Sequence, residues 1–185
     1  ILLASASPRR KQLLEQLGLS VEQKAADIDE SIHEGEADQT YVVRLAQEKA
    51  QALVSLVEAV PIIAADTVIS LQGEIIGKPR DYAHACDIWQ ALAGNTHQVL
   101  TGVCVYSNGQ YATALSISEV SFASLTADEM AAYWATGEPH DKAGAYAVQG
   151  LAARWIREIR GSYSGIMGLP LYETAQLLQK AGLIQ

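Results

Sequence analysis

Val60-Pro61-Ile62-Ile63-Ala64-Ala65-Asp66-Thr67 is the part of the sequence that says most about the architecture. Its first six residues are apolar at consecutive positions, which is typical of a strand buried on both faces of a sheet. We therefore expect a strand over residues 60–65 that presents Asp66 and Thr67 at its far end. The sequence Gln72-Gly73-Glu74 then predicts a turn.

Helical and strand patterns alternate on both sides of this stretch. Hydrophobic spacing and capping residues predict helices over 8–17, with Ser7 as N-cap, and over 40–57, 81–92, 126–135 and 170–181, with Pro170 at the first helical position. Alternation and turn residues predict strands over 1–4, 98–106, 111–122, 145–149 and 153–159, although the last also has helical spacing. A hairpin at 107–109 interrupts the alternation, so we expect an α/β domain with a mixed sheet.

Length and charge limit the class of protein. The 185 residues carry a formal net charge of −8, which fits one compact domain, or one domain with two lobes, over 1–185. Six acidic residues fall between Asp27 and Asp38 with no Lys or Arg among them, which argues against a nucleic-acid binder. No apolar run approaches the length of a membrane span and no secretory signal is visible. Cys86 and Cys104 have no disulfide or zinc spacing, so we expect a cytoplasmic protein.

The segment Ser5-Ala6-Ser7-Pro8-Arg9-Arg10 predicts an anion site at the start of the first helix. Arg9 and Arg10 stand in the first turn, where the helix dipole disfavours cations, so helix stability does not explain them. Backbone N–H groups, serine hydroxyls and two guanidinium groups together suit a phosphate. The alternative is a surface helix whose arginines pair with local acids such as Glu15.

Two lysines and two carboxylates extend this candidate site. Lys49 falls on the apolar stripe of the second predicted helix, so it either snorkels to solvent or meets a buried anion. Lys78, in Gly77-Lys78-Pro79, stands in a loop after a strand, where ligands often bind. Asp66 suits a general base or a metal ligand, or else it caps a turn. Glu30 offers a second carboxylate for an ion such as Mg²⁺.

Several enzyme classes lack their motif in this chain. Neither G-x-x-x-x-G-K-[ST] nor G-x-G-x-x-G occurs, which argues against P-loop and dinucleotide-binding enzymes. The histidines show no zinc-site spacing. Ser7 has no G-x-S-x-G context and neither cysteine has an identifiable partner, so covalent catalysis has little support.

Taken together, these segments resemble the Maf family along nearly the whole chain, in order. They are Ser5 to Arg10, Glu48-Lys49-Ala50, Ala65-Asp66-Thr67, Gly77-Lys78-Pro79, Thr101-Gly102-Val103, Gly137 to Tyr146, Gly161-Ser162-Tyr163 and Gly168-Leu169-Pro170-Leu171. That family comprises nucleoside triphosphate pyrophosphatases once described as septum-formation proteins. The resemblance implies hydrolysis of a nucleoside triphosphate to the monophosphate and pyrophosphate with a divalent cation, Mg²⁺ or Mn²⁺. It also implies an inosine-triphosphatase-like fold, a mixed twisted sheet with flanking helices and two lobes around a central cleft.

The resemblance assigns roles residue by residue. Asp66 is then the proton acceptor and, with Glu30, the metal site. The residues implied to line the triphosphate channel are Ser7, Arg10, Lys49, Lys78 and Lys142, of which Lys49 and Lys78 act in catalysis together with Asp66. Positioned positive charge is what phosphoryl chemistry needs most, so this assignment agrees with the cations found above.

Substrate preference is associated in the family with positions that here hold Arg9, Thr67 and Gln149. This combination resembles the branch that acts on dTTP and UTP, whereas the branch that acts on 7-methyl-GTP differs. The amide of Gln149 can pair with a pyrimidine edge because it both donates and accepts. Ala147 stands where many relatives have glycine in A-Y-G-x-Q-G, which leaves the exact nucleotide, normal or modified, open.

Two further interpretations concern partners. Members of this family often form dimers, so the resemblance implies a homodimer that binds a nucleoside triphosphate and neither nucleic acid nor membrane. The alternative to an enzyme is a nucleotide-binding regulator of septum formation and cell division with weak turnover, which would use the acidic stretch from Asp27 to Asp38 as its interaction surface.

Overall fold

The computed structural model describes residues 1–57 and 60–185, and within them one sheet of seven strands forms the centre of the molecule. The strands are β1 (Leu2–Ala4), β2 (Glu22–Lys24), β3 (Ile62–Leu71), β4 (Glu74–Ile76), β5 (Thr96–Ser107), β6 (Gln110–Phe122) and β7 (Ile156–Arg160). Their order in the sheet is β2-β1-β3-β5-β6-β7, and β4 pairs with β3. β1 is parallel to β2 and β3, while the remaining pairs are antiparallel, so the predicted mixed sheet is confirmed.

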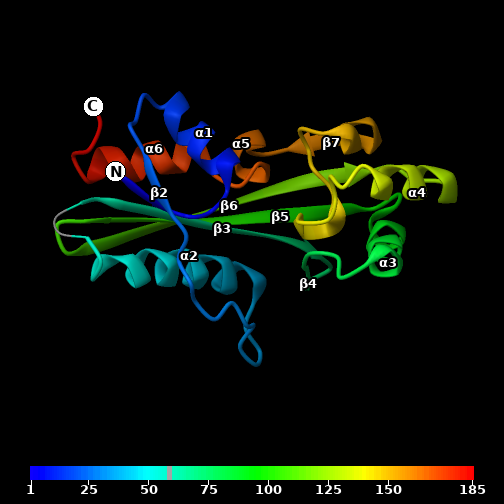
Figure 1. Ribbon diagram of the computed structural model, residues 1–185, viewed down its shortest axis with the longest axis horizontal. Helices are drawn as coiled ribbons and strands as arrows, with labels where there is room; N and C mark the ends of the chain where they lie inside the picture. Colours follow the sequence, from blue (N-terminus) through cyan, green and yellow to red (C-terminus); the bar gives the residue numbers. More distant parts are fainter. Residues whose placement is uncertain (58–59) are drawn as a thin grey trace.

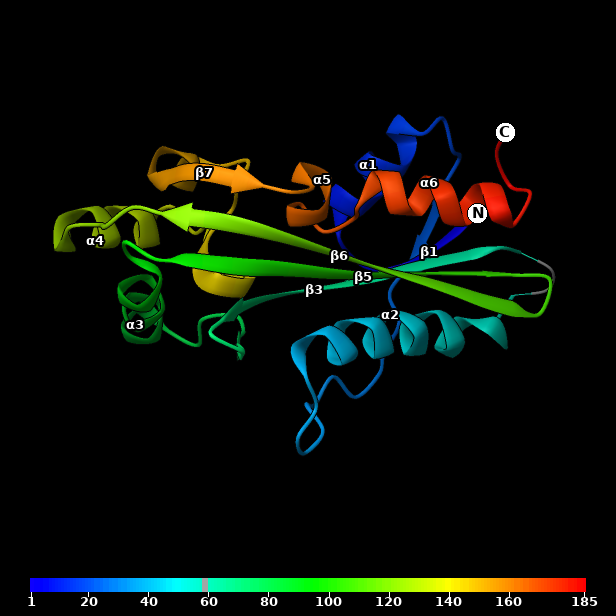
Figure 2. The same ribbon diagram turned by 180° about the vertical axis from the view of Figure 1, so that it is seen from behind.

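Helices cover both faces of this sheet. They are α1 (Pro8–Gln16), α2 (Asp38–Val54), α3 (Tyr82–Leu92), α4 (Ala127–Ala135), α5 (Tyr163–Ile166) and α6 (Leu171–Lys180), with 3-10 turns η1 (Ala143–Ala145) and η2 (Leu151–Trp155). α2 lies along one face, α1 and α6 lie on the other, and α3, α4 and β7 gather at one end of the sheet (Figures 1 and 2). Of the described helices, none has both the length and the hydropathy that crossing a bilayer requires.

β3 is buried as predicted, but it is longer than predicted. Nearly all of its residues are buried, because β1 and β5 flank it and helices cover both faces. The expectation that the strand ends before Asp66 is wrong: pairing with β5 continues to Ser70↔Gln98, and β4 forms a hairpin with Ile69 to Leu71. Asp66 and Thr67 therefore lie in the middle of a strand, where both side chains have fixed directions.

Most local start and stop signals are confirmed. Thr126 and Glu129 form the predicted capping box of α4, and Asn108 and Gly109 adopt φ values of 51° and 80° in the β5–β6 hairpin. Ser7 occupies the N-cap position of α1, yet across residues 7–16, all described, its hydroxyl makes no capping hydrogen bond. Pro170 is the N-cap of α6 and not its first helical residue.

Three short elements and one segment differ from the prediction. β2, β4 and α5 have three or four residues each, too few for a periodic pattern. The prediction of a strand over 145–149 is wrong. Gly144 and Ala145 both adopt positive φ and belong to η1, and the residues after them form a turn. The ambiguous segment 153–159 divides between η2 and β7, so each of its two spacings describes one part of it.

Gly102 explains how α2 approaches the sheet closely. It lies on β5 directly opposite Asp66 of β3. A Cβ atom at this position would overlap the carbonyl group of Val42 in α2. The missing side chain therefore lets α2 lie against β5 and β3, and two turns further along the helix Lys49 comes over the sheet.

Candidate active site

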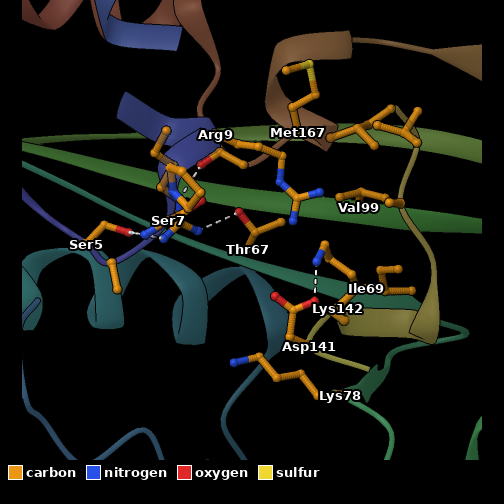
Figure 3. A pocket seen from close by; sticks show the side chains of 18 of the residues that line it. Ser5, Ser7, Arg9, Thr67, Ile69, Lys78, Val99, Asp141, Lys142 and Met167 are labelled. Carbon is orange, nitrogen blue, oxygen red and sulfur yellow. Dashed lines mark hydrogen bonds and ion pairs between the residues drawn. The ribbon is translucent and has the colours of Figure 1, made fainter. Parts of the chain in front are cut away.

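A cavity of about 620 Å³ lies at the edge of β3, between its pairing with β1 and its pairing with β4. β1 pairs with Ile62 and Ile63, and β4 pairs from Ile69 onward. Over residues 64–68, within the described chain, β3 pairs with β5 along one side only. The wall is completed by the β1–α1 connection, by the segment before α6 and by residues 141–148 (Figure 3).

Asp66 and Thr67 serve opposite faces of the sheet, because successive side chains of a strand alternate. Thr67 lies on the α1 side and lines the cavity, where Arg10 donates a hydrogen bond to its hydroxyl at 3.1 Å. Asp66 lies on the α2 side, where it meets Lys49. The site thus has two parts, joined at the edge of β3.

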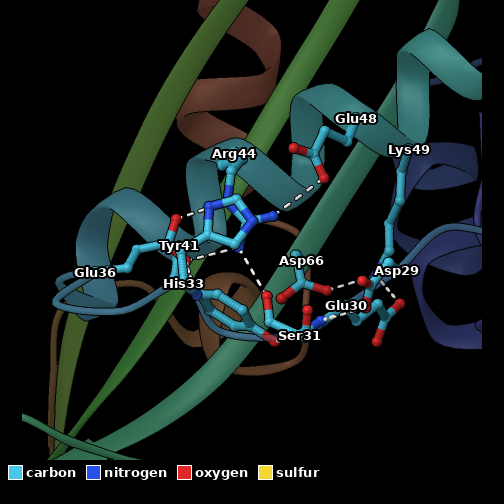
Figure 4. A network of polar contacts seen from close by, with 10 residues as sticks. All are labelled: Asp29, Glu30, Ser31, His33, Glu36, Tyr41, Arg44, Glu48, Lys49 and Asp66. Atoms are coloured by element: carbon cyan, nitrogen blue, oxygen red, sulfur yellow. Dashed lines mark hydrogen bonds and ion pairs between the residues drawn. The ribbon is translucent and has the colours of Figure 1, made fainter.

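On the α2 side, one ammonium group bridges two carboxylates. Lys49 Nζ lies 2.6 Å from Asp66 Oδ1 and 2.6 Å from Glu30 Oε1 (Figure 4). Lys49 and Asp66 are 9% and 7% exposed, while the Glu30 side chain is 53% exposed. The alternative that Lys49 snorkels to solvent is therefore wrong, and so is the alternative that Asp66 caps a turn.

The donor set of Glu30 and Asp66 fits a hard divalent cation. The two carboxylates, from different segments, converge on a position that already carries positive charge. No group of three or more Asp, Glu, His or Cys side chains suited to a metal occurs among the described residues. Mg²⁺ usually takes only one or two protein carboxylates and completes its shell with water and phosphate oxygens. Glu30 and Asp66 are the residues that would hold such an ion.

The loop that carries Glu30 is anchored to α2 by contacts that the sequence analysis missed. Tyr41 donates a hydrogen bond to the carbonyl of Glu30 at 2.8 Å, and Arg44 Nη2 donates to the carbonyl of Ser31 at 3.0 Å. Arg44 also binds Glu36 at 2.6 Å through Nε (Figure 4). Burial, with the negative charge of Asp66 and Glu30, raises the pKa of Tyr41 to about 12, so its hydroxyl stays a donor. The one feature of the sequence that could have drawn attention to Arg44 was its i,i+4 spacing from Glu48, with which it forms an ion pair at 3.1 Å.

Arg10 has a different position from the other cations of the site. Its guanidinium donates to the carbonyl of Gly168 at 2.7 Å and to the hydroxyl of Ser5 at 3.1 Å, besides Thr67. Burial lowers the pKa of Arg10, and the negative charge of Asp66 and Glu30 opposes that effect. The alternative of an arginine paired with Glu15 is wrong, because Glu15 pairs with Lys11. Arg10 thus connects the β1–α1 segment, through Ser5, to β3 and to the segment before α6.

A directed chain of hydrogen bonds runs behind Thr67. Thr101 donates its hydroxyl proton to the carbonyl of Gly165 at 2.8 Å, so it must accept from the Thr67 hydroxyl at 2.9 Å, and the Thr67 oxygen in turn accepts from Arg10. Thr101 is fully buried. The chain fixes the Thr67 side chain and leaves its oxygen one acceptor site toward the cavity.

Cationic side chains from three separate segments point into the cavity. Arg9, Lys78 and Lys142 come from α1, from the loop after β4 and from the segment before η1 (Figure 3). Lys142 pairs with the carboxylate of Asp141, a cavity residue that the sequence analysis did not select. Ser7 lies on the same wall. Positive charge from distant parts of the chain is thereby concentrated around one space.

The cavity also has apolar lining. The apolar and aromatic residues of its wall include Ile69, Val99, Tyr146, Ala147, Val148, Ile166 and Met167, and Figure 3 shows Lys142 beside Ile69. Figure 3 shows Ile69, Val99 and Met167 away from Ser5 and Ser7. Gln149 lies in the exposed turn next to Val148. Of the residues selected from the sequence, Ser7, Arg9, Arg10, Glu30, Lys49, Thr67, Lys78 and Lys142 line the cavity, Asp66 adjoins it through Lys49, and Gln149 lies beside it.

Comparison with known proteins gives the same family along almost the full length. Residues 1–181 match the family model described as Maf-like protein. A protein of Acinetobacter baylyi named dTTP/UTP pyrophosphatase is 49% identical over 178 residues, 96% of this chain and 97% of its own. Proteins of the same name from Salmonella typhimurium and Colwellia psychrerythraea are 50% and 44% identical, covering 95% and 100% of this chain and 90% and 89% of their own.

Proposed function

Because this chain belongs to the Maf family, we propose that it is a nucleoside triphosphate pyrophosphatase that hydrolyses dTTP and UTP to the monophosphate and pyrophosphate. The observation that carries the proposal is the composition of the cavity wall. The wall combines the cationic side chains of Arg9, Lys78 and Lys142 with apolar side chains such as Ile69, Val99 and Met167. A nucleoside triphosphate likewise combines a charged phosphate chain with a largely apolar base.

The cationic part binds the triphosphate. Guanidinium and ammonium groups on separate segments can each hold different phosphate oxygens, and the hydroxyl of Ser7 adds a donor. Binding releases Lys142 from Asp141, because a phosphate carries more charge than one carboxylate. These cations stabilise the charge that develops on the phosphate oxygens in the transition state.

Asp66 takes the proton of the attacking water. Its carboxylate is buried and held at Oδ1 by Lys49, so its orientation is fixed before substrate arrives. A positioned general base of this kind contributes roughly 10²- to 10⁴-fold to rate. Lys49 and Lys78 act with it by placing positive charge beside the reacting phosphate.

A divalent cation, Mg²⁺ or Mn²⁺, is held by Glu30 and Asp66. When bound, it neutralises phosphate charge and helps to orient the substrate. The support is the convergence of two carboxylates on one position, together with the solvent exposure of Glu30, which leaves room for water and phosphate ligands.

Arg9, Thr67 and Gln149 select the base. Arg9 and Thr67 line the cavity, and the oxygen of Thr67 retains one acceptor site. Gln149 stands in the turn that follows the apolar wall, and it turns inward to meet the edge of the pyrimidine.

The remaining parts of the proposal concern the whole molecule. The chain acts as a single domain of two lobes, with separate hydrophobic clusters at the α3–α4 end and beside α1 and α6, and the cavity lies between them. It works as a homodimer in the cytoplasm. Light scattering coupled to gel filtration measures the oligomeric state, and fractionation of cells measures the location.

The regulator of septum formation has no observation in its favour. Its interaction surface was to be the acidic stretch from Asp27 to Asp38. In the structure two carboxylates of that stretch already form ion pairs within the chain, Glu30 with Lys49 and Glu36 with Arg44.

Pyrophosphate release tests the proposed function. The panel contains dTTP, UTP, CTP, dATP, GTP and 7-methyl-GTP, each with Mg²⁺, with Mn²⁺ and with EDTA. Metal-dependent release led by dTTP and UTP is the expected result. Preference for 7-methyl-GTP would keep the reaction and reject the specificity assignment, and no release from any triphosphate would reject the enzyme.

A further inference from the structure

Tyr133 lies in the last turn of α4 and Glu138 just after it. Their side chains bind the backbone at the start of the turn of residues 147–150 and at Leu151, which follows it. The Tyr133 hydroxyl donates to Glu138 Oε1 at 2.6 Å and accepts from the N–H of Ala147 at 3.3 Å. Glu138 Oε2 accepts from the N–H of Leu151 at 3.0 Å. Two side chains thus bind both ends of one turn.

The pair is rigid. Tyr133 is 2% exposed, and its ring packs against Trp89 and Trp155 with ring centroids 5.5 and 5.2 Å away. Burial and the carboxylate of Glu138 raise the pKa of Tyr133, so the hydroxyl keeps its proton and remains a donor. Hydrogen bonds to a carboxylate are about twice as strong as neutral ones. The turn has one hydrogen bond of its own, from the N–H of Gly150 to the carbonyl of Ala147 at 3.0 Å, and buried Tyr133 and half-buried Glu138 tie it to the end of α4.

Gly150 adds an independent sign that the turn is built around Glu138. A Cβ atom at Gly150 would overlap the Glu138 carboxylate. The backbone of Gly150, at φ −113° and ψ −155°, is not in the left-handed region, so its conformation does not call for glycine. A side chain at this position would instead force the Glu138 carboxylate to move away from Leu151.

The turn begins in the cavity wall. Ala147 and Val148 form part of the wall and Gln149 follows them. The cations of the triphosphate channel lie on other segments, apart from Lys142. A small displacement of the turn would therefore change contacts with the base and leave most phosphate contacts in place.

We propose that Tyr133 and Glu138 are a positioning pair that fixes the turn of residues 147–150 and thereby sets which nucleobase the enzyme accepts. This proposal rests on the proposed function. Tyr133 and Glu138 are not among the residues that line the cavity, so the Glu138 carboxylate and the Tyr133 hydroxyl act through the backbone N–H groups of Leu151 and Ala147.

The test compares kcat and KM for dTTP and for GTP in Tyr133→Phe, Glu138→Ala and Gly150→Ala. Losing one such hydrogen bond corresponds to about a tenfold effect, so we expect KM for dTTP to rise about tenfold. The ratio of kcat/KM for dTTP over GTP falls by a similar factor, while kcat for dTTP stays within about threefold. Glu138→Gln keeps an acceptor for Leu151 and has a smaller effect than Glu138→Ala.

Thr126→Ala is the matched control, because it removes the N-cap of the same helix and, among the residues that the structure describes, the Thr126 side chain bonds only to Glu129. It lowers the melting temperature without changing the dTTP to GTP ratio. If Tyr133→Phe and Glu138→Ala keep the wild-type ratio, or if Thr126→Ala shifts it equally, the positioning role is rejected. Wild-type protein that releases no pyrophosphate from dTTP or UTP rejects the proposed function instead.

Discussion

The ammonium of Lys49 lies 2.6 Å from Oδ1 of Asp66, and both side chains are buried at the junction of α2 and β3. The same ammonium also meets Glu30. Lys49 thus occupies the position between two carboxylates that the proposed divalent cation would use, so the two cations would compete for it. A bound triphosphate would relieve this competition by offering its oxygens to the Lys49 ammonium.

Lys49→Met is expected to increase metal binding and decrease turnover. Removing the ammonium leaves a buried carboxylate without its partner, which costs roughly 3–5 kcal/mol, so the variant melts at a lower temperature in EDTA. Mn²⁺ then restores more of its melting temperature than it adds to wild type. Differential scanning fluorimetry with and without Mn²⁺ measures this. Lys11→Met, at an exposed ion pair of α1, is the control, and an equal response in both variants would contradict the competition.

Asp66→Asn is expected to remove the general base and keep the fold. The amide has the same shape and can still accept a hydrogen bond from Lys49, whose charge Glu30 continues to balance, so the melting temperature falls less than in Lys49→Met. Pyrophosphate release from dTTP falls roughly 10²- to 10⁴-fold at saturating Mg²⁺ or Mn²⁺. Asp87→Asn, exposed on α3, is the matched control. Retained turnover in Asp66→Asn would show that another group takes the proton.

Gly102→Ala is expected to destabilise the protein through a steric conflict. The added methyl group overlaps the Val42 carbonyl, so α2 must move away from β5 at a cost of about 1–3 kcal/mol or more. Urea unfolding measures the loss in the free energy of unfolding. Gly77→Ala provides the comparison, because a Cβ there meets nothing within 4 Å. Equal stability of the two variants would argue against the close helix–strand approach.

Stability is expected to decrease as the pH falls from 6.5 toward 4. Burial lowers the pKa of His97 to about 4, whereas the unfolded chain has the ordinary value near 6.5. Between these two pH values the unfolded state binds more protons than the folded state. Lowering the pH from 6.5 to 4 therefore decreases the free energy of unfolding by on the order of 3 kcal/mol. Urea unfolding at several pH values measures the slope. His97→Phe flattens it, and His33→Gln, at an exposed histidine, leaves it as in wild type.

Local signals predicted most of the elements, because they act within a few residues. The capping box of Thr126 and Glu129 and the turn at Asn108-Gly109 depend only on neighbouring backbone. β2 was missed because its three residues are all exposed and show no alternation. The end of β3 was misplaced because polar Asp66 and Thr67 resemble the end of a strand, while β5 extends the pairing beyond them.

The chemical nature of the candidate site followed from residue types, whereas its geometry did not. A lysine on an apolar helical stripe left two alternatives, snorkelling to solvent or a buried anion, and the structure decides for carboxylates, those of Asp66 and Glu30. The supports of the site were not visible. Tyr41, Thr101 and Tyr133 form hydrogen bonds with Glu30, Thr67 and Ala147, which are 11, 34 and 14 residues away, and no local pattern encodes such contacts.

The sequence by itself determined the fold class, the family and the kinds of charged group in the site, since hydrophobic period, capping and motif are written in neighbouring residues. Only the tertiary structure decided that Asp66 and Thr67 serve opposite faces, that Arg10 braces the site, and that Gln149 stands outside the cavity wall. These facts depend on strand register and on the close approach of α2 at Gly102. Both arise from packing between segments far apart in the chain.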